Sequence, residues 1–177
     1  MKNIRNLSLL ATSTPLTFKS FLRKPLRFLI QMVTGSRIEH VALYCQKKVL
    51  QSSGRGVELI PFDEWLEHYK NSKIFKFQFT RKLKLKEILY FHEFAKIHAG
   101  KDYSAFQAAY SALDLLPIFR ELDLHSQEEM FCSKLCAKFY EDIGWIKIDE
   151  AKTNPKELIH QLNSLHLTNG RERCKKK

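Results

Sequence analysis

The chain has 177 residues, a formal net charge of +11 and a hydrophobic content of 44%. This length is sufficient for one domain with a hydrophobic core and too short to expect two. So basic a balance is typical of proteins that contact an anionic surface, such as phospholipid headgroups, nucleic acid or an acidic partner. A charged, solvated surface is the alternative interpretation.

The cysteines and the N-terminal residues bear on the cellular compartment. Cys45, Cys132, Cys136 and Cys174 show no paired spacing, so we expect neither a disulfide framework nor a zinc site. The apolar run near the N-terminus breaks at residues 12–15, and no segment reaches the roughly 18 apolar residues that span a bilayer. We therefore expect a cytoplasmic protein without a signal peptide, cofactor or metal.

The first half of the chain predicts mostly strands. Residues 6–11 predict a strand, and residues 18–33 predict a cationic amphipathic helix, because apolar residues recur at helical spacing between basic ones. A helix is predicted at 64–70 with Asp63 as its cap. Four further strands, separated by turns that include one at Lys47-Lys48, are predicted at 38–45, 48–52, 57–61 and 73–80.

The second half predicts helices. They are expected at 85–98, at 103–116, at 132–143 and from Pro155 onward, where proline suits the first turn. Strands followed by helices are typical of an α+β domain. We expect this single domain to span residues 1–165 and the basic residues 166–177 to form a disordered tail.

Two residues carry candidate chemistry. Cys132 opens a predicted helix, where unpaired N–H groups and a partial positive charge favour the thiolate. His40 lies at the start of a predicted strand. A cysteine and a histidine that meet in space are the minimum for a thiol hydrolase or acyltransferase. The alternatives are a buried thiol that packs as a small hydrophobe and an ordinary histidine at a strand start; Cys45 and Cys136 are interpreted as core residues.

Six segments resemble motifs of one family, in the order in which that family has them. They are 35–44 (GSRIEHVALY), 49–52 (VLQS), 56–65 (GVELIPFDEW), 100–103 (GKDY), 131–135 (FCSKL) and 153–158 (TNPKEL). Together they resemble the permuted NlpC/P60 papain-like family, which includes bacterial proteins of the YiiX/YaeF type and a poxvirus protein. Ordinary papain-like chains have the cysteine first, whereas here His40 precedes Cys132, as in the permuted group.

The resemblance implies a circularly permuted papain-like fold, in which an antiparallel sheet packs against helices and the nucleophile lies at a helix N-terminus. It implies Cys132 as nucleophile, His40 as general base and Gln51 as the third, orienting residue. The family commonly has Glu at that position, and an amide accepts a hydrogen bond without supplying charge. We therefore expect Gln51→Glu to leave activity unchanged or to raise it. Tyr103 either lines the site as a substrate-binding residue or belongs to the core.

The function that follows is that of a cysteine-dependent hydrolase or acyltransferase acting on an amide, ester or thioester bond of a peptide-like or lipid substrate. The alternative, which the uncharged Gln51 keeps open, is a catalytically weak or inactive papain-like binding module at an anionic surface. Peripheral contact with an anionic membrane through residues 18–33 is compatible with either function. Nucleic acid is not expected as a partner, because no stacking motif or recognition helix is present.

Overall fold

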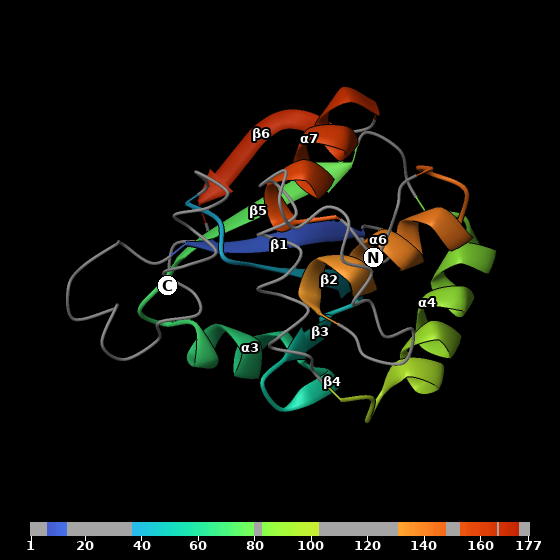
Figure 1. The fold of residues 1–177 in the computed structure, drawn as a ribbon, viewed down its shortest axis with the longest axis horizontal. Coiled ribbons are helices and arrows are strands. Elements are labelled where there is room, and N and C mark those ends of the chain that lie inside the picture. The colour runs from blue at the N-terminus through green and yellow to red at the C-terminus, as the bar shows by residue number, and fades with distance from the viewer. Residues whose placement is uncertain are drawn as a thin grey trace, which may run out of the picture.

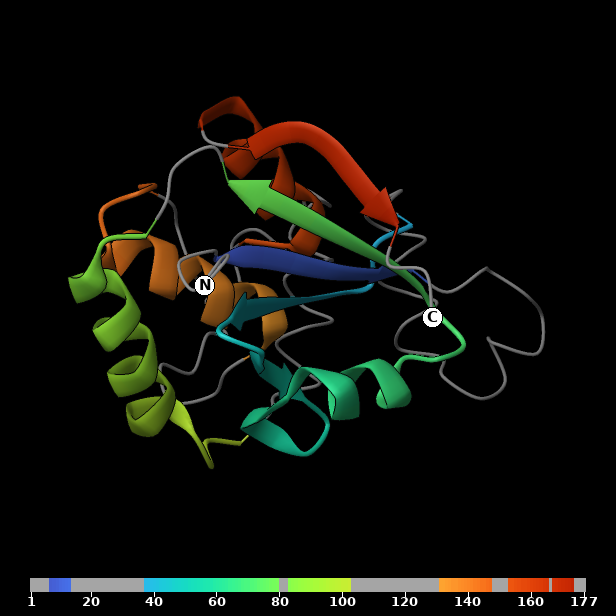
Figure 2. The same ribbon diagram turned by 180° about the vertical axis from the view of Figure 1, so that it is seen from behind.

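The computed structural model describes residues 7–13, 37–79, 83–102, 131–147, 153–165 and 167–173. These residues form a six-stranded sheet and four helices (Figure 1, and from behind in Figure 2). The helices predicted at 18–33 and 103–116, with Tyr103, lie outside the described residues. None of the helices that the structure describes is long and apolar enough to cross a membrane.

The sheet is antiparallel throughout and has the strand order β4-β3-β2-β1-β5-β6. The β2–β3 hairpin turns at Gln46 and Lys47, whose φ angles of 49° and 62° match the strand twist in a two-residue turn. This is one residue before the predicted turn. The strands are β1 (Ser8–Ser13), β2 (His40–Cys45), β3 (Lys48–Ser53), β4 (Gly56–Pro61), β5 (Lys73–Phe79) and β6 (Leu167–Arg173).

Strand β6 lies in the segment that was expected to be a disordered tail. Its residues pair antiparallel with β5 from Phe75↔Arg173 to Phe79↔Leu167, with a register shift between. The polar sequence of 167–173 has no apolar alternation, and so gave no strand signal. The N–H and C=O groups along the outer side of β5 supply the pairing instead, because a sheet edge accepts a strand through its backbone.

The sheet separates two hydrophobic clusters. The larger one lies between the sheet and the helices α4 (Leu85–His98), α6 (Cys132–Asp142) and α7 (Pro155–Leu165). The smaller one lies under α3 (Phe62–His68) on the other face. Strand β2 contributes Val41, Leu43 and Cys45 to the first cluster, and Ala42 and Tyr44 pack in the second, as the two-residue alternation of a strand requires.

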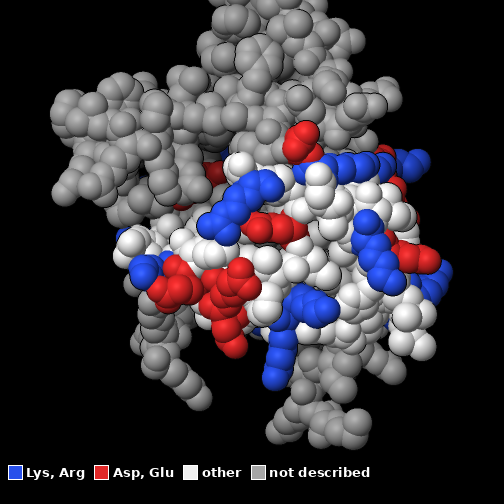
Figure 3. Space-filling model, turned by 90° about the horizontal axis from the view of Figure 1, so that it is seen from below, with Lys and Arg blue, Asp and Glu red and all other residues white. Residues whose placement is uncertain are grey.

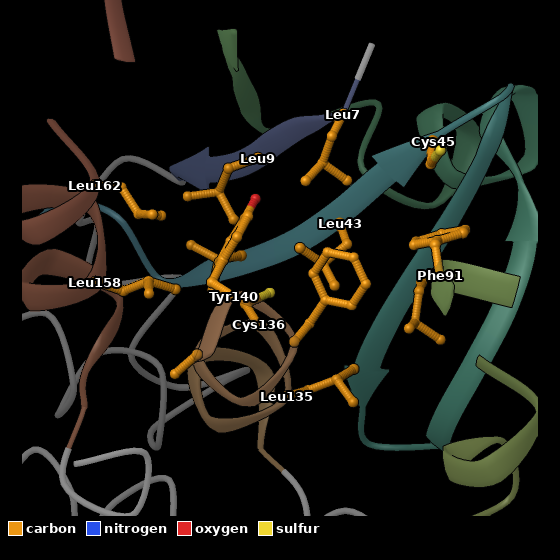
Figure 4. Close-up of a cluster of buried hydrophobic side chains, with 14 of the residues drawn as sticks. Leu7, Leu9, Leu43, Cys45, Phe91, Leu135, Cys136, Tyr140, Leu158 and Leu162 are labelled. Carbon is orange, nitrogen blue, oxygen red and sulfur yellow. The ribbon is translucent and has the colours of Figure 1, made fainter. Parts of the chain in front are cut away.

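Helix α6 is the central helix of the larger cluster. Figure 4 shows Leu135, Cys136 and Tyr140 of α6 facing Leu43 of β2. Each of these four side chains is completely buried. Cys45 is also fully buried, so the prediction that Cys45 and Cys136 belong to the core is confirmed.

The helix bounds agree with the predictions to within one residue except for α3, which begins and ends two residues before the predicted range 64–70. Helix α4 has the predicted range, and α6 ends one residue earlier than expected. Helix α3 begins at Phe62 after Pro61, so Asp63 lies inside its first turn and makes no cap hydrogen bond. Asp63 therefore acts on the helix through the favourable interaction of a carboxylate with the helix N-terminus.

The charged side chains of the described residues are mixed in sign where Figure 3 shows them. On the face seen there, blue lysine and arginine side chains lie between red aspartate and glutamate side chains. This described surface therefore gives no single-sign patch. Contact with an anionic membrane stays a prediction, since the basic residues 18–33 that would make it lie outside the described ranges.

Candidate functional site

His40 is the first residue of β2 and is 6% exposed. It lies opposite Thr12 of β1. Its ring stacks on that of Tyr69, with centroids 5.2 Å apart and planes 11° from parallel. Its Nε2 lies 3.1 Å from Oε1 of Gln51. The strand start therefore holds the imidazole between an aromatic face and a carbonyl oxygen.

Gln51, in β3, has its amide orientation fixed at both ends. Its Oε1 accepts a hydrogen bond from Trp65 Nε1 at 2.9 Å, and the indole N–H can only donate. Its Nε2 donates to Oε1 of Glu58 at 2.8 Å, and an ionised carboxylate can only accept. The donor-only indole and the acceptor-only carboxylate require the same orientation of the amide, so they identify which of its ends is oxygen and which is nitrogen.

The orientation of Gln51 determines the tautomer of His40. Because His40 Nε2 faces a carbonyl oxygen, this nitrogen carries the hydrogen and donates it. In the neutral imidazole the lone pair then resides on Nδ1. The nitrogen of His40 that is able to take a proton is therefore Nδ1.

Helix α3 and the residue that follows it cover this polar pair. Trp65 and Tyr69 are four residues apart, so they lie on one side of the helix, and their ring centroids are 4.8 Å apart. Trp65 is fully buried, and the Tyr69 hydroxyl lies 3.3 Å from Gln51 Oε1. Excluding water from the hydrogen bond between His40 and Gln51 strengthens it. The sequence had assigned a role in the site neither to Trp65, the last residue of the motif at 56–65, nor to Tyr69.

Cys132 is the first residue of α6 and is 6% exposed. Phe131 precedes it with extended backbone, φ −107° and ψ 166°, and provides no side-chain cap. Ser133 Oγ donates to the carbonyl oxygen of Thr153 at 2.6 Å, which ties the helix start to the segment before α7. With no carboxylate in its first turn, the positive end of α6 is left for an anion such as a thiolate.

The predicted site residues lie on adjoining elements. The structure brings His40 and Gln51 into contact on the α3 side of the sheet. It places Cys132 in the cluster on the other side, together with Val41 and Leu43. Helix α6 packs on the two strands, β2 and β3, that carry His40 and Gln51. Tyr103 lies outside the described residues.

Two other thiols are unsuited to nucleophilic chemistry. Burial raises the pKa of Cys45 to about 11. Burial, and then the neighbouring Cys132, raise the pKa of Cys136 well above its ordinary value. Both thiols are therefore protonated at neutral pH. Among the described residues, no group of three or more His, Cys, Asp or Glu side chains is arranged so that it could hold a metal ion.

Comparison with solved structures shows a likeness of fold. No protein-family model and no curated protein matches the sequence. The structure resembles the crystal structure of the metalloprotein YiiX from Escherichia coli O157:H7 (DUF1105), with a TM-score of 0.56. The chain has a YiiX-like fold. The likeness covers 90% of this chain and 81% of YiiX at 16% sequence identity, so it concerns the fold alone.

Proposed function

We propose that this chain is a cysteine-dependent hydrolase or acyltransferase with a permuted papain-like domain of the NlpC/P60 type. It acts on an amide, ester or thioester bond in a peptide-like or lipid substrate. The observation that carries the proposal is the His40–Gln51 hydrogen bond, because it leaves Nδ1 of His40 as a base. The YiiX-like fold and the position of Cys132 at the start of α6 support it.

In the proposed reaction, Nδ1 of His40 takes the proton of the Cys132 thiol. The sulfur forms a bond to the substrate carbonyl carbon, and the first-turn N–H groups of α6 stabilise the developing oxyanion. The bond to the leaving group then breaks, and His40 returns the proton to that group. Water or an acceptor alcohol or amine attacks the acyl thioester, loses its proton to Nδ1 and releases Cys132.

The reactivity of Cys132 tests this proposal, and the chain contains its own controls. We expect iodoacetamide to label Cys132 with a half-maximal rate well below pH 7, whereas Cys45 and Cys136 stay unlabelled in the folded protein. Peptide mapping by mass spectrometry assigns each label. His40→Ala is expected to remove the fast labelling, and Cys132→Ala to abolish turnover. A Cys132 thiol that titrates near the ordinary value of about 8.5 contradicts the proposal.

One observation favours the second function, a catalytically inactive binding module with the same fold. By strand alternation His40 lies on the α3 side of β2, whereas Cys132 lies in the cluster that contains Val41 and Leu43. A 1,3-dihaloacetone, which first alkylates a thiol and then a nearby nucleophile, discriminates between the two functions. An intramolecular bridge from Cys132 to His40 supports the enzyme. Alkylation of Cys132 that never proceeds to the bridge in folded protein supports the binding module.

A further inference from the structure

The Gln51 amide is one half of a pair of opposed side chains. In the β3–β4 hairpin Gln51 lies directly opposite Glu58. The Glu58 carboxylate accepts hydrogen bonds from Gln51 Nε2 at 2.8 Å and from Ser53 Oγ at 3.1 Å. A hydrogen bond to an ionised acceptor is roughly twice as strong as a neutral one. Glu58 thus holds the end of the amide that does not face His40.

We propose that Glu58 is a positioning residue for His40: acting through Gln51, it fixes the imidazole as the Nε2–H tautomer and keeps a negative charge one side chain away from the ring. The chain of contacts runs from Glu58 to Gln51 Nε2, and from Gln51 Oε1 to His40 Nε2. This inference rests on the proposed function for its catalytic meaning, but the contacts themselves do not depend on it.

The chemical types at positions 51 and 58 are therefore coupled. Gln51→Glu replaces the donor Nε2 by an oxygen, 2.8 Å from an oxygen of Glu58. Two carboxylates at such a distance cannot both ionise, so one of them must bind a proton. The expectation that Gln51→Glu preserves or raises activity considered His40 and Gln51 alone. Because Glu58 lies opposite Gln51, we expect the reverse: Gln51→Glu alone lowers activity. The additional substitution Glu58→Gln is needed to accommodate a carboxylate at position 51.

Exchanging the two side chains tests the coupling without reference to activity. We compare Gln51→Glu with the double variant Gln51→Glu/Glu58→Gln, in which a carboxylate at 51 again meets an amide at 58. The titratable side chains in contact with position 51, His40 and Tyr69, are the same in both variants. Any difference between the two in the pH dependence of stability therefore comes from the second carboxylate.

The sign of the difference follows from linkage. In the single variant one carboxyl group has a raised pKa in the folded state, so the folded protein binds more protons than the unfolded chain above about pH 4.3. Its free energy of unfolding, relative to the double variant, should therefore fall as the pH rises. Equal pH profiles from urea unfolding at pH 4 to 8 would overturn the proposal. A single variant that folds only at low pH would support it.

Two further readouts separate this inference from the proposed function. Nitrogen-15 NMR of wild-type His40 should show the hydrogen on Nε2; an Nδ1–H tautomer contradicts the positioning role even in an active enzyme. Iodoacetamide labelling of Cys132 should slow in Gln51→Glu by about 10- to 100-fold, the range found when a partner that orients a metal-binding imidazole is lost. It should recover partly in the double variant. If the tautomer and stability results hold while Cys132 is unreactive in wild type, the proposed function fails and the positioning role stands.

Discussion

Replacing Gly56 by alanine tests how closely the start of β4 is held against the segment after α4. Gly56 has a φ of +93°, and a Cβ atom at this position would lie 2.7 Å from the backbone oxygen of Lys101. That oxygen accepts a hydrogen bond from the N–H of Val57, and the N–H of Gly100 donates to the oxygen of Val57, both at 2.9 Å. An alanine side chain therefore requires the two backbones to separate.

The expected loss of stability has two parts. Holding an alanine at positive φ costs about 1–3 kcal/mol. Moving Lys101 away weakens two backbone hydrogen bonds, each worth about 0.5–1.5 kcal/mol. We therefore expect Gly56→Ala to lower the free energy of unfolding by about 2–6 kcal/mol.

Two other glycines separate the cost of the positive φ from the cost of the close contact. Gly100 has a φ of +83° but no atom within 4 Å of its ideal Cβ, so Gly100→Ala should lose only the backbone contribution of about 1–3 kcal/mol. Gly54 also has no atom within 4 Å of that position and is not at positive φ. Gly54→Ala should therefore be neutral, or stabilising by up to about 1 kcal/mol through the unfolded chain.

Urea unfolding followed by tryptophan fluorescence measures all three variants on one scale. Stability should decrease in the order Gly54→Ala, Gly100→Ala, Gly56→Ala. If Gly56→Ala is no less stable than Gly100→Ala, the close approach of Lys101 to β4 does not hold in solution. The result also bears on the candidate site, because residues 100–102 lead into Tyr103.

Two shorter predictions concern the helices around the site. Burial, and then the positive charges of Lys101 and Lys138, lower the pKa of His98 to about 4 from 6.5. The folded protein thus binds fewer protons than the unfolded chain between these values. The free energy of unfolding should fall as the pH drops through that window, by up to about 1.4 kcal/mol per pH unit. Urea unfolding of His98→Gln should show a shallower dependence of this free energy on pH. An unchanged pH dependence contradicts the lowered pKa of His98. Ser133→Ala removes the hydroxyl that donates to the buried Thr153 carbonyl at 2.6 Å. We therefore expect the free energy of unfolding to fall by about 1–3 kcal/mol and the labelling of Cys132 to slow. A loss below about 0.5 kcal/mol would mean that water replaces the hydroxyl.

Local patterns predicted most of the sheet and the helices. Strands β2, β3 and β4 follow from apolar runs separated by short turns, and α4 follows from its regular apolar spacing. Strand β6 could not be predicted in this way, because it joins the sheet through backbone pairing with β5 and not through an apolar face. The tail therefore read as disordered although its backbone is paired.

The candidate site was predictable in part. His40 and Gln51 were identified from the family motifs, and the pairing of Gln51 with Glu58 follows from the two-residue turn Gly54-Arg55 between β3 and β4. The contributions of Trp65 and Tyr69 were not predictable, because they depend on how α3 packs across the sheet. No spacing along the chain reports that α3 and the residue that follows it donate two hydrogen bonds to the amide oxygen of Gln51.

Gln51 stands where the family that the sequence resembles commonly has Glu, and this arrangement offers a physical explanation for the amide. A carboxylate at 51 would receive three donors, from His40, Trp65 and Tyr69, but it would also face Glu58. An amide satisfies both sides at once, since its oxygen accepts and its nitrogen donates. The negative charge is thus retained on β4, and the group next to the imidazole stays neutral. Gln51, whose lack of charge first kept the inactive binding module open, is therefore the residue type that suits its position opposite Glu58 on β3 and β4.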